Sequence, residues 1–383
     1  MHLKFSEEHQ MLRQTVREFA ASEIKPLARK IDEEEFIPRE LIEKIAEVGL
    51  LGTAFPEKYG GGGFGEVGYC IAQEEVARVC GSTATFIGAH QSIGTNAIYI
   101  GGSEELKEKY LPQLTSGEKI AAFCLTEAQA GSDSFNIKTS AVKKGNKWII
   151  NGEKLWITNG AIADIFTVFA RTEKGITGFV VEKEFGGVEV GPNEKKLGIR
   201  GSVTNPIRFN NVEVPEENLI GREGRGFPIA MKALDAGRLT VGACSLGAAK
   251  EMLELSVQYA NQRVQFDQPI SQFEAIQFMI ADMTSKIYLM ESILFRAAQK
   301  YDDGLDVSQD AAIVKLYASE AVQKIADMAL QIHGGMGYSR ELPIERFYRD
   351  VRILKIFEGT SEIQKLIISR KTIKNNGQWR FDG

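Results

Sequence analysis

Four separated segments of the chain carry side chains that can hold an anion or an aromatic ligand, or move a proton. The first, residues 123–133, passes from an expected strand into a Gly131-Ser132 turn, which offers hydroxyls and backbone N–H groups to an anion or a ring edge. The second places Trp156 two residues before the Thr158 hydroxyl, and strand alternation predicts that both face one side. Taken alone, an indole is more often part of a core than of a binding wall.

The other two segments lie in the last third of the chain. Arg263 and Phe266 follow a long helical pattern, and Glu358 comes after the glycine pair Gly334-Gly335. Each also has a plain structural interpretation. The arginine suits a surface ion pair, the glycines suit a helix C-cap, and the glutamate suits the start of a helix, where acids are favoured. The functional interpretation is favoured over the structural one because all four segments occur in order along one chain.

Three zones of different periodicity must position these segments. Residues 5–118 and residues from 227 onward show apolar side chains at helical spacing, with a continuous stripe from Ile276 to Leu294. Residues 119–226 alternate like strands and are punctuated densely by glycine and proline. The sequence therefore predicts a mainly α protein with a central β domain, its outer zones resembling helical bundles. Strands and helices do not alternate along the chain, which disfavours a doubly wound sheet.

Composition excludes several classes of function. The 383 residues carry a net charge of -5, which argues against non-specific nucleic-acid binding. The four cysteines form no CxxC pair, so we expect reduced, mostly buried thiols, and the scattered histidines predict no metal site. No apolar stretch approaches the roughly 20 residues that span a bilayer, and the N-terminus has no signal-peptide core. We expect a cytoplasmic protein, or the mature form of a mitochondrial matrix enzyme, without membrane insertion.

Residues 59–65 contain a formal GxGxxG at Gly60, Gly62 and Gly65. A dinucleotide fingerprint needs a preceding strand and a following helix within a βαβ unit. The residues before this run have a helical pattern, so a glycine-rich loop is the favoured interpretation. There is no Walker A sequence and no GxSxG nucleophile motif.

From about residue 5 to about residue 373, the chain resembles the acyl-CoA dehydrogenase family. The motifs that carry the resemblance are CLTEAQAGSD, WITNG, RVQF, QIHGGMGY and IFEGTSEIQ. It implies an N-terminal helical domain (1–118), a middle β-barrel (119–226) and a C-terminal four-helix bundle (227–383). It also implies FAD as cofactor, a homotetramer, and oxidation of a saturated acyl-CoA to the trans-2-enoyl-CoA, with electrons passed to an electron-transfer flavoprotein.

The resemblance also implies which residues meet FAD. Bonds to the polar edge of its ring would stabilise the negative charge that a hydride brings. The contacts expected within one protomer are Phe123, Leu125, Thr126, Gly131, Ser132, Trp156, Ile157, Thr158, Thr360 and Glu362. Those expected from a neighbouring protomer are Arg263, Gln265, Phe266, Gln331, Gly334 and Gly335.

Glu358 matches the family's base, which removes a proton from the carbon next to the thioester. Desolvation by the acyl chain would raise its pKa toward the working range. One branch of the family carries its base at the position of Gly237, which cannot do this work. Substrate contacts implied by the resemblance are Ser132, Asp235, Arg238 and Gly359, although a helix-packing ion pair is the alternative for Arg238.

Some details depart from the family pattern or narrow it. Ala128 replaces a usual proline, Phe357 replaces a frequent tyrosine, and Glu274 is not assigned to FAD. The run beginning at Gly88-Ala89 is most similar to very-long-chain enzymes without their C-terminal extension, and small residues there favour a deep tunnel and medium to long acyl chains. Two alternatives stay open: an oxidase that reduces oxygen, and a nucleic-acid-associated flavoprotein of the same fold.

Overall fold

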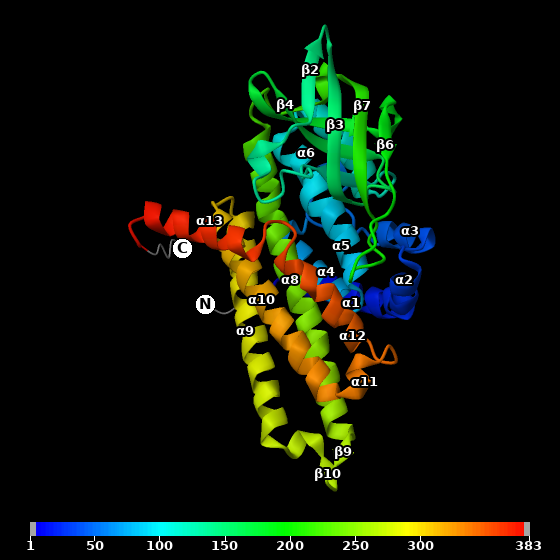
Figure 1. Ribbon diagram of the computed structural model, residues 1–383, viewed down its shortest axis with the longest axis vertical. Coiled ribbons are helices and arrows are strands. Elements are labelled where there is room, and N and C mark those ends of the chain that lie inside the picture. The colour runs from blue at the N-terminus through cyan, green and yellow to red at the C-terminus, as the bar shows by residue number, and fades with distance from the viewer. Residues whose placement is uncertain (1–4, 379–383) are drawn as a thin grey trace.

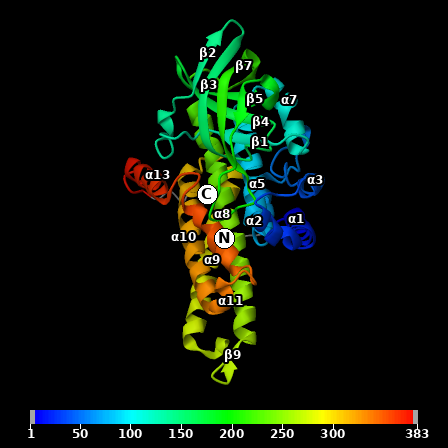
Figure 2. The same ribbon diagram turned by 45° about the vertical axis from the view of Figure 1, so that its right-hand side comes forward.

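A β domain stands at one end of a long helical body in the computed structural model, which describes residues 5–378 (Figure 1). Residues 1–4 and 379–383 lie outside this range. They include the ends of the first and third expected domains and the start of the N-terminus, in which no signal peptide is expected. Turning the molecule shows the same division, with the sheet above and the helices α8 to α11 below (Figure 2).

The N-terminal zone is helical and packs around its own apolar cluster. Its helices are α1 (Glu7–Phe19), α2 (Ala28–Glu34), α3 (Arg39–Glu47), α4 (Gly65–Ala77), α5 (Gly81–Gly88), α6 (Asn96–Gly101) and α7 (Glu104–Thr115). Ser103 caps α7 by accepting a hydrogen bond from the backbone N–H of Leu106, as its position predicts. Between α5 and α6 the chain winds as a π-helix, Ala89–Thr95, a form found often at functional sites.

The middle zone is one eight-stranded sheet, with β1 paired in parallel beside β4. The hydrogen-bonded order β6-β7-β3-β2-β4-β5-β8 has β6 and β8 at its ends. The strands are β1 (Ala121–Cys124), β2 (Ser140–Lys144), β3 (Lys147–Thr158), β4 (Ile165–Thr172), β5 (Gly175–Glu182), β6 (Val188–Val190), β7 (Thr204–Pro215) and β8 (Leu219–Ile220). The hairpin that Gly175 predicts joins β4 to β5.

Long helices return after the sheet and share the largest apolar cluster. They are α8 (Gly226–Gln262), α9 (Glu274–Asp302), α10 (Ser308–His333), α11 (Gly335–Tyr338), α12 (Ile344–Val351) and α13 (Ser361–Lys374). A small hairpin of β9 (Val264–Gln265) and β10 (Gln268–Pro269) connects α8 to α9 at the end opposite the sheet (Figure 1).

The glycine-rich run at 60–65 is a loop, as expected, preceded by a short 3-10 turn rather than a strand. The N-terminus of α4 behind it is already capped, because Asp302 accepts hydrogen bonds from Glu66 N (2.6 Å) and Val67 N (3.0 Å). An anion therefore finds no free N–H pair at those two residues.

No helix within residues 5–378 is long and apolar enough to cross a membrane.

The π-helix places the sheet close to the expected base. A Cβ added to Gly94 would lie 2.9 Å from the Ala121 Cβ of β1, and the Thr167 hydroxyl donates to the Gly94 carbonyl. On the other side, a Cβ on Gly237 of α8 would lie 2.9 Å from the Ile93 side chain. The π-helix thus contacts both the sheet and α8.

Candidate active site

Glu358 has a carboxylate that is shielded from water and incompletely bonded. Its Oε2 atom is fully buried and has no hydrogen-bond partner in the part of the chain that the structure describes. Burial raises the pKa of Glu358 to about 7, although the charges of Arg238 and Lys315 act in the opposite direction. This shift is present without an acyl chain. A carboxylate with such a pKa can take up and release a proton near neutrality.

The glycine at 237 makes room for this carboxylate. A Cβ added to Gly237 would lie only 2.0 Å from Glu358 Oε2, so any larger residue at this position of α8 would displace the base. The sequence excludes Gly237 as a base, and the structure adds that its missing side chain accommodates the base on the facing loop.

The loop that carries Glu358 is held in an unusual backbone conformation. Glu358 has φ of +54° and Gly359 has φ of +92°, both in the left-handed region. The Gln364 side chain donates to the carbonyls of Glu358 (3.2 Å) and Gly359 (2.9 Å), and the Thr360 side chain caps α13. Such over-determined strain is characteristic of sites where orientation matters.

Trp156 is not a core residue. It is 59% exposed, sits at φ of +60°, and lies where the pairing of β3 with β7 shifts register. A bulge therefore interrupts the strand at this point, where alternation assumes regular pairing. Trp156 and Thr158 nevertheless remain accessible, while Ile157 between them is buried.

The segment after β1 meets the end of β3 through the backbone. Leu155 N donates to the Thr126 carbonyl at 2.9 Å, so the two segments expected at the cofactor are adjacent. Leu125 and Ile157 point their side chains into the interior, so only their backbone can face a ligand. Phe123 and Thr126 are partly exposed, whereas Gly131 and Ser132 lie open on the surface.

A buried ion pair fixes these two segments together. The Lys154 ammonium donates to Glu127 Oε1 (2.8 Å) and to the Leu125 carbonyl (2.9 Å), and neither partner's side chain is more than 4% exposed. Burial alone would raise the pKa of Glu127, but the donors around it outweigh that effect and lower it to about 2. Burial lowers the pKa of Lys154.

Arg238 adopts the alternative that the sequence left open. It is 4% exposed and donates to Asp235 Oδ1 at 2.5 Å, within one turn of α8. Burial raises the pKa of Asp235 to about 6. The contact of Arg238 with a CoA phosphate stays a prediction, and its charge faces Glu358 rather than bulk solvent.

The remaining expected cofactor residues lie at the other end of α8. Phe266 is 87% exposed in the tip of the β9–β10 hairpin, and Arg263, Gln265, Gln331, Gly334 and Gly335 are also exposed. The Tyr259 ring stacks on His333 at 4.5 Å, which brings the end of α10 beside the end of α8. Twenty-five residues of helix separate Arg238 from Arg263, or about 37 Å at 1.5 Å per residue. One chain does not bring the two halves of the expected FAD site together.

Thr360 and Glu362 lie directly after the base, at the start of α13. Thr360 accepts a hydrogen bond from Ile363 N, which leaves its hydroxyl hydrogen available, and Glu362 is exposed. Lys315 was not identified from the sequence. Its ammonium donates to the Gly359 carbonyl at 2.6 Å, although the residue is fully buried.

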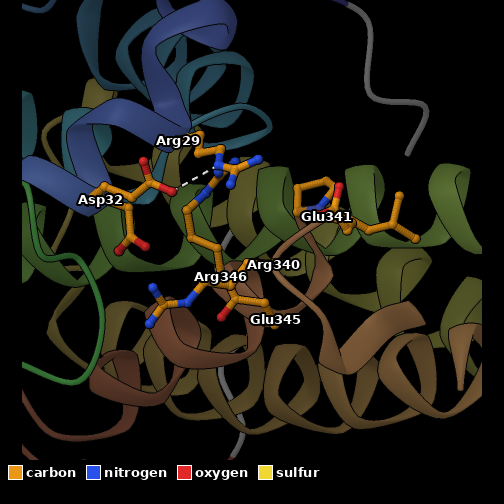
Figure 3. A pocket seen from close by; sticks show the side chains of 9 residues that line it. Arg29, Asp32, Arg340, Glu341, Glu345 and Arg346 are labelled. Atoms are coloured by element: carbon orange, nitrogen blue, oxygen red, sulfur yellow. Dashed lines mark hydrogen bonds and ion pairs between the residues drawn. The ribbon is translucent and has the colours of Figure 1, made fainter. Parts of the chain in front are cut away.

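A separate hollow lies between α2 and the segment leading into α12 (Figure 3). Most of the residues that line it are charged, and among them Arg29 pairs with Glu33 at 2.8 Å. It contains none of the residues expected at the site, so it contributes nothing to the chemistry considered above.

Three family models match the chain in sequence. They are the N-terminal domain of acyl-CoA dehydrogenase at residues 6–118, the middle domain at 122–212 and the C-terminal domain at 224–373. A short-chain specific acyl-CoA dehydrogenase of Clostridium acetobutylicum is 43% identical over 98% of this chain and 100% of its own length. An acryloyl-CoA reductase (NADH) of Anaerotignum propionicum is 42% identical over 98% of this chain and 96% of its own length.

Two solved structures extend the comparison. One, described as the electron transferring flavoprotein of Acidaminococcus fermentans, matches with a TM-score of 0.96 at 40% identity, over 98% of this chain and 100% of that one. The other is an acyl-CoA dehydrogenase complexed with FAD from Bacillus anthracis. It matches with a TM-score of 0.93 at 39% identity, over 97% of this chain and 68% of that one. The expected likeness to very-long-chain enzymes finds no support in these names.

Proposed function

This chain belongs to the acyl-CoA dehydrogenase family, and we propose that it oxidises a short saturated acyl-CoA to the trans-2-enoyl-CoA with Glu358 as the base. The observation that carries the proposal is the buried, unpartnered Oε2 of Glu358. It accepts the proton from the carbon next to the thioester, while the β-carbon loses a hydride. Because the base is ionised only above its raised pKa, turnover should increase as the pH rises through about 7.

The residues present fit FAD. Trp156 offers an exposed aromatic face in a rigid bulge, and a Cβ added to Gly131 would meet nothing within 4 Å. The match to a solved structure that is complexed with FAD supports the same cofactor for this chain. When bound, FAD supplies the two-electron acceptor for the hydride. The N–H groups and hydroxyls of Thr126 and Thr158 would orient its polar edge.

A shared cofactor site follows from the separation of the two expected halves. Since about 37 Å of helix lies between them, the Arg263 and Gln331 ends would serve the flavin of another protomer. This supports a homo-oligomer, with the tetramer as the assembly implied by the family. Phe266 and Tyr338, at 87% and 81% exposure, are apolar contacts suited to such an interface. The match to a structure described as an electron transferring flavoprotein supports such a protein as the electron acceptor.

A short acyl chain is favoured by packing at Gly88. A Cβ added there would lie 3.1 Å from the Thr240 methyl, 3.9 Å from Gln73 Nε2 and 4.0 Å from the Tyr69 hydroxyl. The space beside Gly88 is therefore limited by a neighbouring side chain, which favours a short acyl chain over the medium to long chains expected from the sequence. The short-chain name of a 43% identical relative points the same way.

The test is the visible spectrum of the purified holoprotein during anaerobic titration with butyryl-, octanoyl- and palmitoyl-CoA. We expect a yellow protein whose flavin is bleached fastest by the four-carbon ester. A protein that takes up no FAD, or one that no saturated acyl-CoA bleaches, would refute the proposal.

Enoyl-CoA reduction is the second candidate, favoured by the 42% identical acryloyl-CoA reductase. A carboxyl with a pKa of about 7 can also return its proton to the α-carbon, so the same site serves both directions. Consumption of trans-2-enoyl-CoA with NADH, in the absence of any bleaching by saturated esters, would establish this direction instead.

A further inference from the structure

Lys315 is a buried cation in the middle of α10. It is fully buried, and its ammonium donates to the Gly359 carbonyl at 2.6 Å. A buried ammonium is costly unless it is paired or fully hydrogen-bonded, yet this contact is to a neutral carbonyl. Burial lowers the pKa of Lys315 to about 8, which leaves it mostly protonated at neutral pH. Residues kept at such a cost are frequently functional.

The carbonyl that Lys315 holds belongs to the residue after the base. Gly359 O accepts from Lys315 and also from Gln364 Nε2 at 2.9 Å, so two donors on two helices fix one peptide. That peptide joins Gly359 to Thr360, and both Gly359 and the preceding Glu358 are in the left-handed region. A shift of the Gly359 carbonyl would therefore move the Glu358 side chain away from its position beside Gly237.

The helices α8, α10 and α13 carry the charged groups to be weighed around Glu358, of which Arg238 and Lys315 act on its pKa. On α8, Arg238 is present, but Asp235 lies 2.5 Å from its guanidinium and offsets much of its charge. On α10, Glu320 is engaged with Lys355 (2.8 Å) and with the Ser361 hydroxyl (2.8 Å), and on α13 Glu362 is exposed. Lys315 is thus a nearby cation that forms no ion pair with a carboxylate within residues 5–378.

Resting on the proposed function, we infer that Lys315 is the positioning residue of the base. Its N–H fixes the Gly359 carbonyl and so aims the Glu358 carboxylate, and its positive charge favours the ionised form of that carboxylate. The two roles are separable, because a neutral donor can replace the first and not the second.

The test compares Lys315→Met, which loses donor and charge, with Lys315→Gln, which can keep a donor. Lys324→Met, at an exposed lysine on the same helix, is the matched control. Titration of Glu358 is followed by difference infrared spectroscopy of each holoprotein against the same protein carrying Glu358→Gln. This readout reports the base even if no acyl-CoA is oxidised, which separates a failure of this inference from a failure of the proposed function.

In both Lys315 variants we expect the titration midpoint to rise by about one pH unit, as removal of a nearby opposite charge predicts. Flavin reduction at saturating substrate and high pH should fall at least about tenfold more in Lys315→Met than in Lys315→Gln, because misplacement of reacting groups is costly. Lys324→Met should match wild type. Unchanged midpoints in both Lys315 variants, with unchanged plateau rates, would overturn the inference; if Lys315→Met does not fold, the Lys315→Gln midpoint decides alone.

Discussion

Two glutamates with buried carboxylate oxygens in this molecule differ in how those oxygens are bonded. Glu127, between β1 and β2, is 5% exposed and accepts four hydrogen bonds, from the side chains of Lys154 and Gln129 and from the N–H groups of Lys138 and Thr139. Its pKa is lowered to about 2. Glu358 has one oxygen with no partner within residues 5–378, and its pKa is raised to about 7.

The comparison teaches that donors, and not burial, decide what a buried carboxylate does. A carboxylate whose lone pairs are all engaged is a structural anion that ties segments together. One that is desolvated and left partly unsatisfied is poised to accept a proton. In this fold the first kind ties the segment after β1 to β3, and the second lies on the loop that leads into α13.

The largest effect should come from removing the poised carboxylate. Glu358→Gln keeps the shape and loses the proton acceptor, so turnover should fall by about 10²- to 10⁴-fold or more while FAD content stays unchanged. Steady-state oxidation of butyryl-CoA, normalised to bound flavin, measures this. Glu118→Gln, at an exposed surface position, is the control and should match wild type. Near-normal turnover in Glu358→Gln would remove the distinction between the two glutamates.

Breaking the structural pair should instead cost stability. Lys154→Met leaves Glu127 buried without its cation, which typically costs about 3–5 kcal/mol. Chemical denaturation of the holoprotein at fixed excess FAD measures the loss. Lys147→Met, at the exposed start of the same strand, should lose far less because its partner Glu213 is exposed too. Equal losses of stability in Lys154→Met and Lys147→Met would show that the buried pair does not hold the two segments together.

The pair also predicts an acid limb of stability. The pKa of Glu127 is lower in the folded chain than its ordinary value of 4.5, so its contribution is complete above about pH 4.5 and is lost as the pH falls toward 2. Glu127→Gln should therefore lose stability at pH 7 and lose less on acidification than wild type. Denaturation curves between pH 7 and pH 3 distinguish the two, and parallel acid limbs would contradict the assignment.

Filling the space beside the base should disturb its aim without changing its chemistry. In Gly237→Ala the added methyl would lie 2.0 Å from Glu358 Oε2, so the base must move. Displacements of this size can cost about 10²-fold in rate. Stopped-flow flavin reduction measures the effect. Gly304→Ala, at an open surface turn whose φ of +72° strains the added methyl, is a control for the general cost of replacing a glycine. A normal rate in Gly237→Ala would show that the loop tolerates displacement.

The smallest effect is a gain in stability. The pKa of Glu358 is higher in the folded chain than the ordinary 4.5, so wild-type stability falls as the pH rises from 4.5 to 7, and the deficit is complete above 7. Glu358→Gln does not titrate. It should be more stable than wild type at pH 8 by on the order of 1–3 kcal/mol, with the difference gone below pH 4.5. A difference independent of pH would contradict the raised pKa.

The sequence predicts the order of helical and strand zones well, because hydrophobic periodicity is local. It also predicts Glu358 as the base, because the residues around it are distinctive, and that role stays a prediction. It does not reveal that Gly237 seats the carboxylate, since that contact joins residues 121 positions apart. The sequence also does not predict the bulge at Trp156, because the alternation rule assumes a regular strand.

Lys315 and Lys154 were missed for a shared reason, since a lysine is usually assigned to a solvated face. A signal was present in both cases. Ala311, Lys315, Ala318 and Val322 follow helical spacing on one buried face, and Lys154 shares the inward register of Trp148 and Ile150. A charged residue on the apolar stripe of an element predicts a buried contact that the stripe alone does not explain.

Exchange of the α-proton tests the central claim most directly. An acyl-CoA with sulfur in place of its β-carbon cannot lose a hydride there, so only proton removal is observed when the holoprotein is incubated with it in D2O. We predict that wild type deuterates the α-carbon, while Glu358→Gln binds the ester and FAD but exchanges no faster than the ester alone. Exchange at the wild-type rate in Glu358→Gln would show that another group removes the proton.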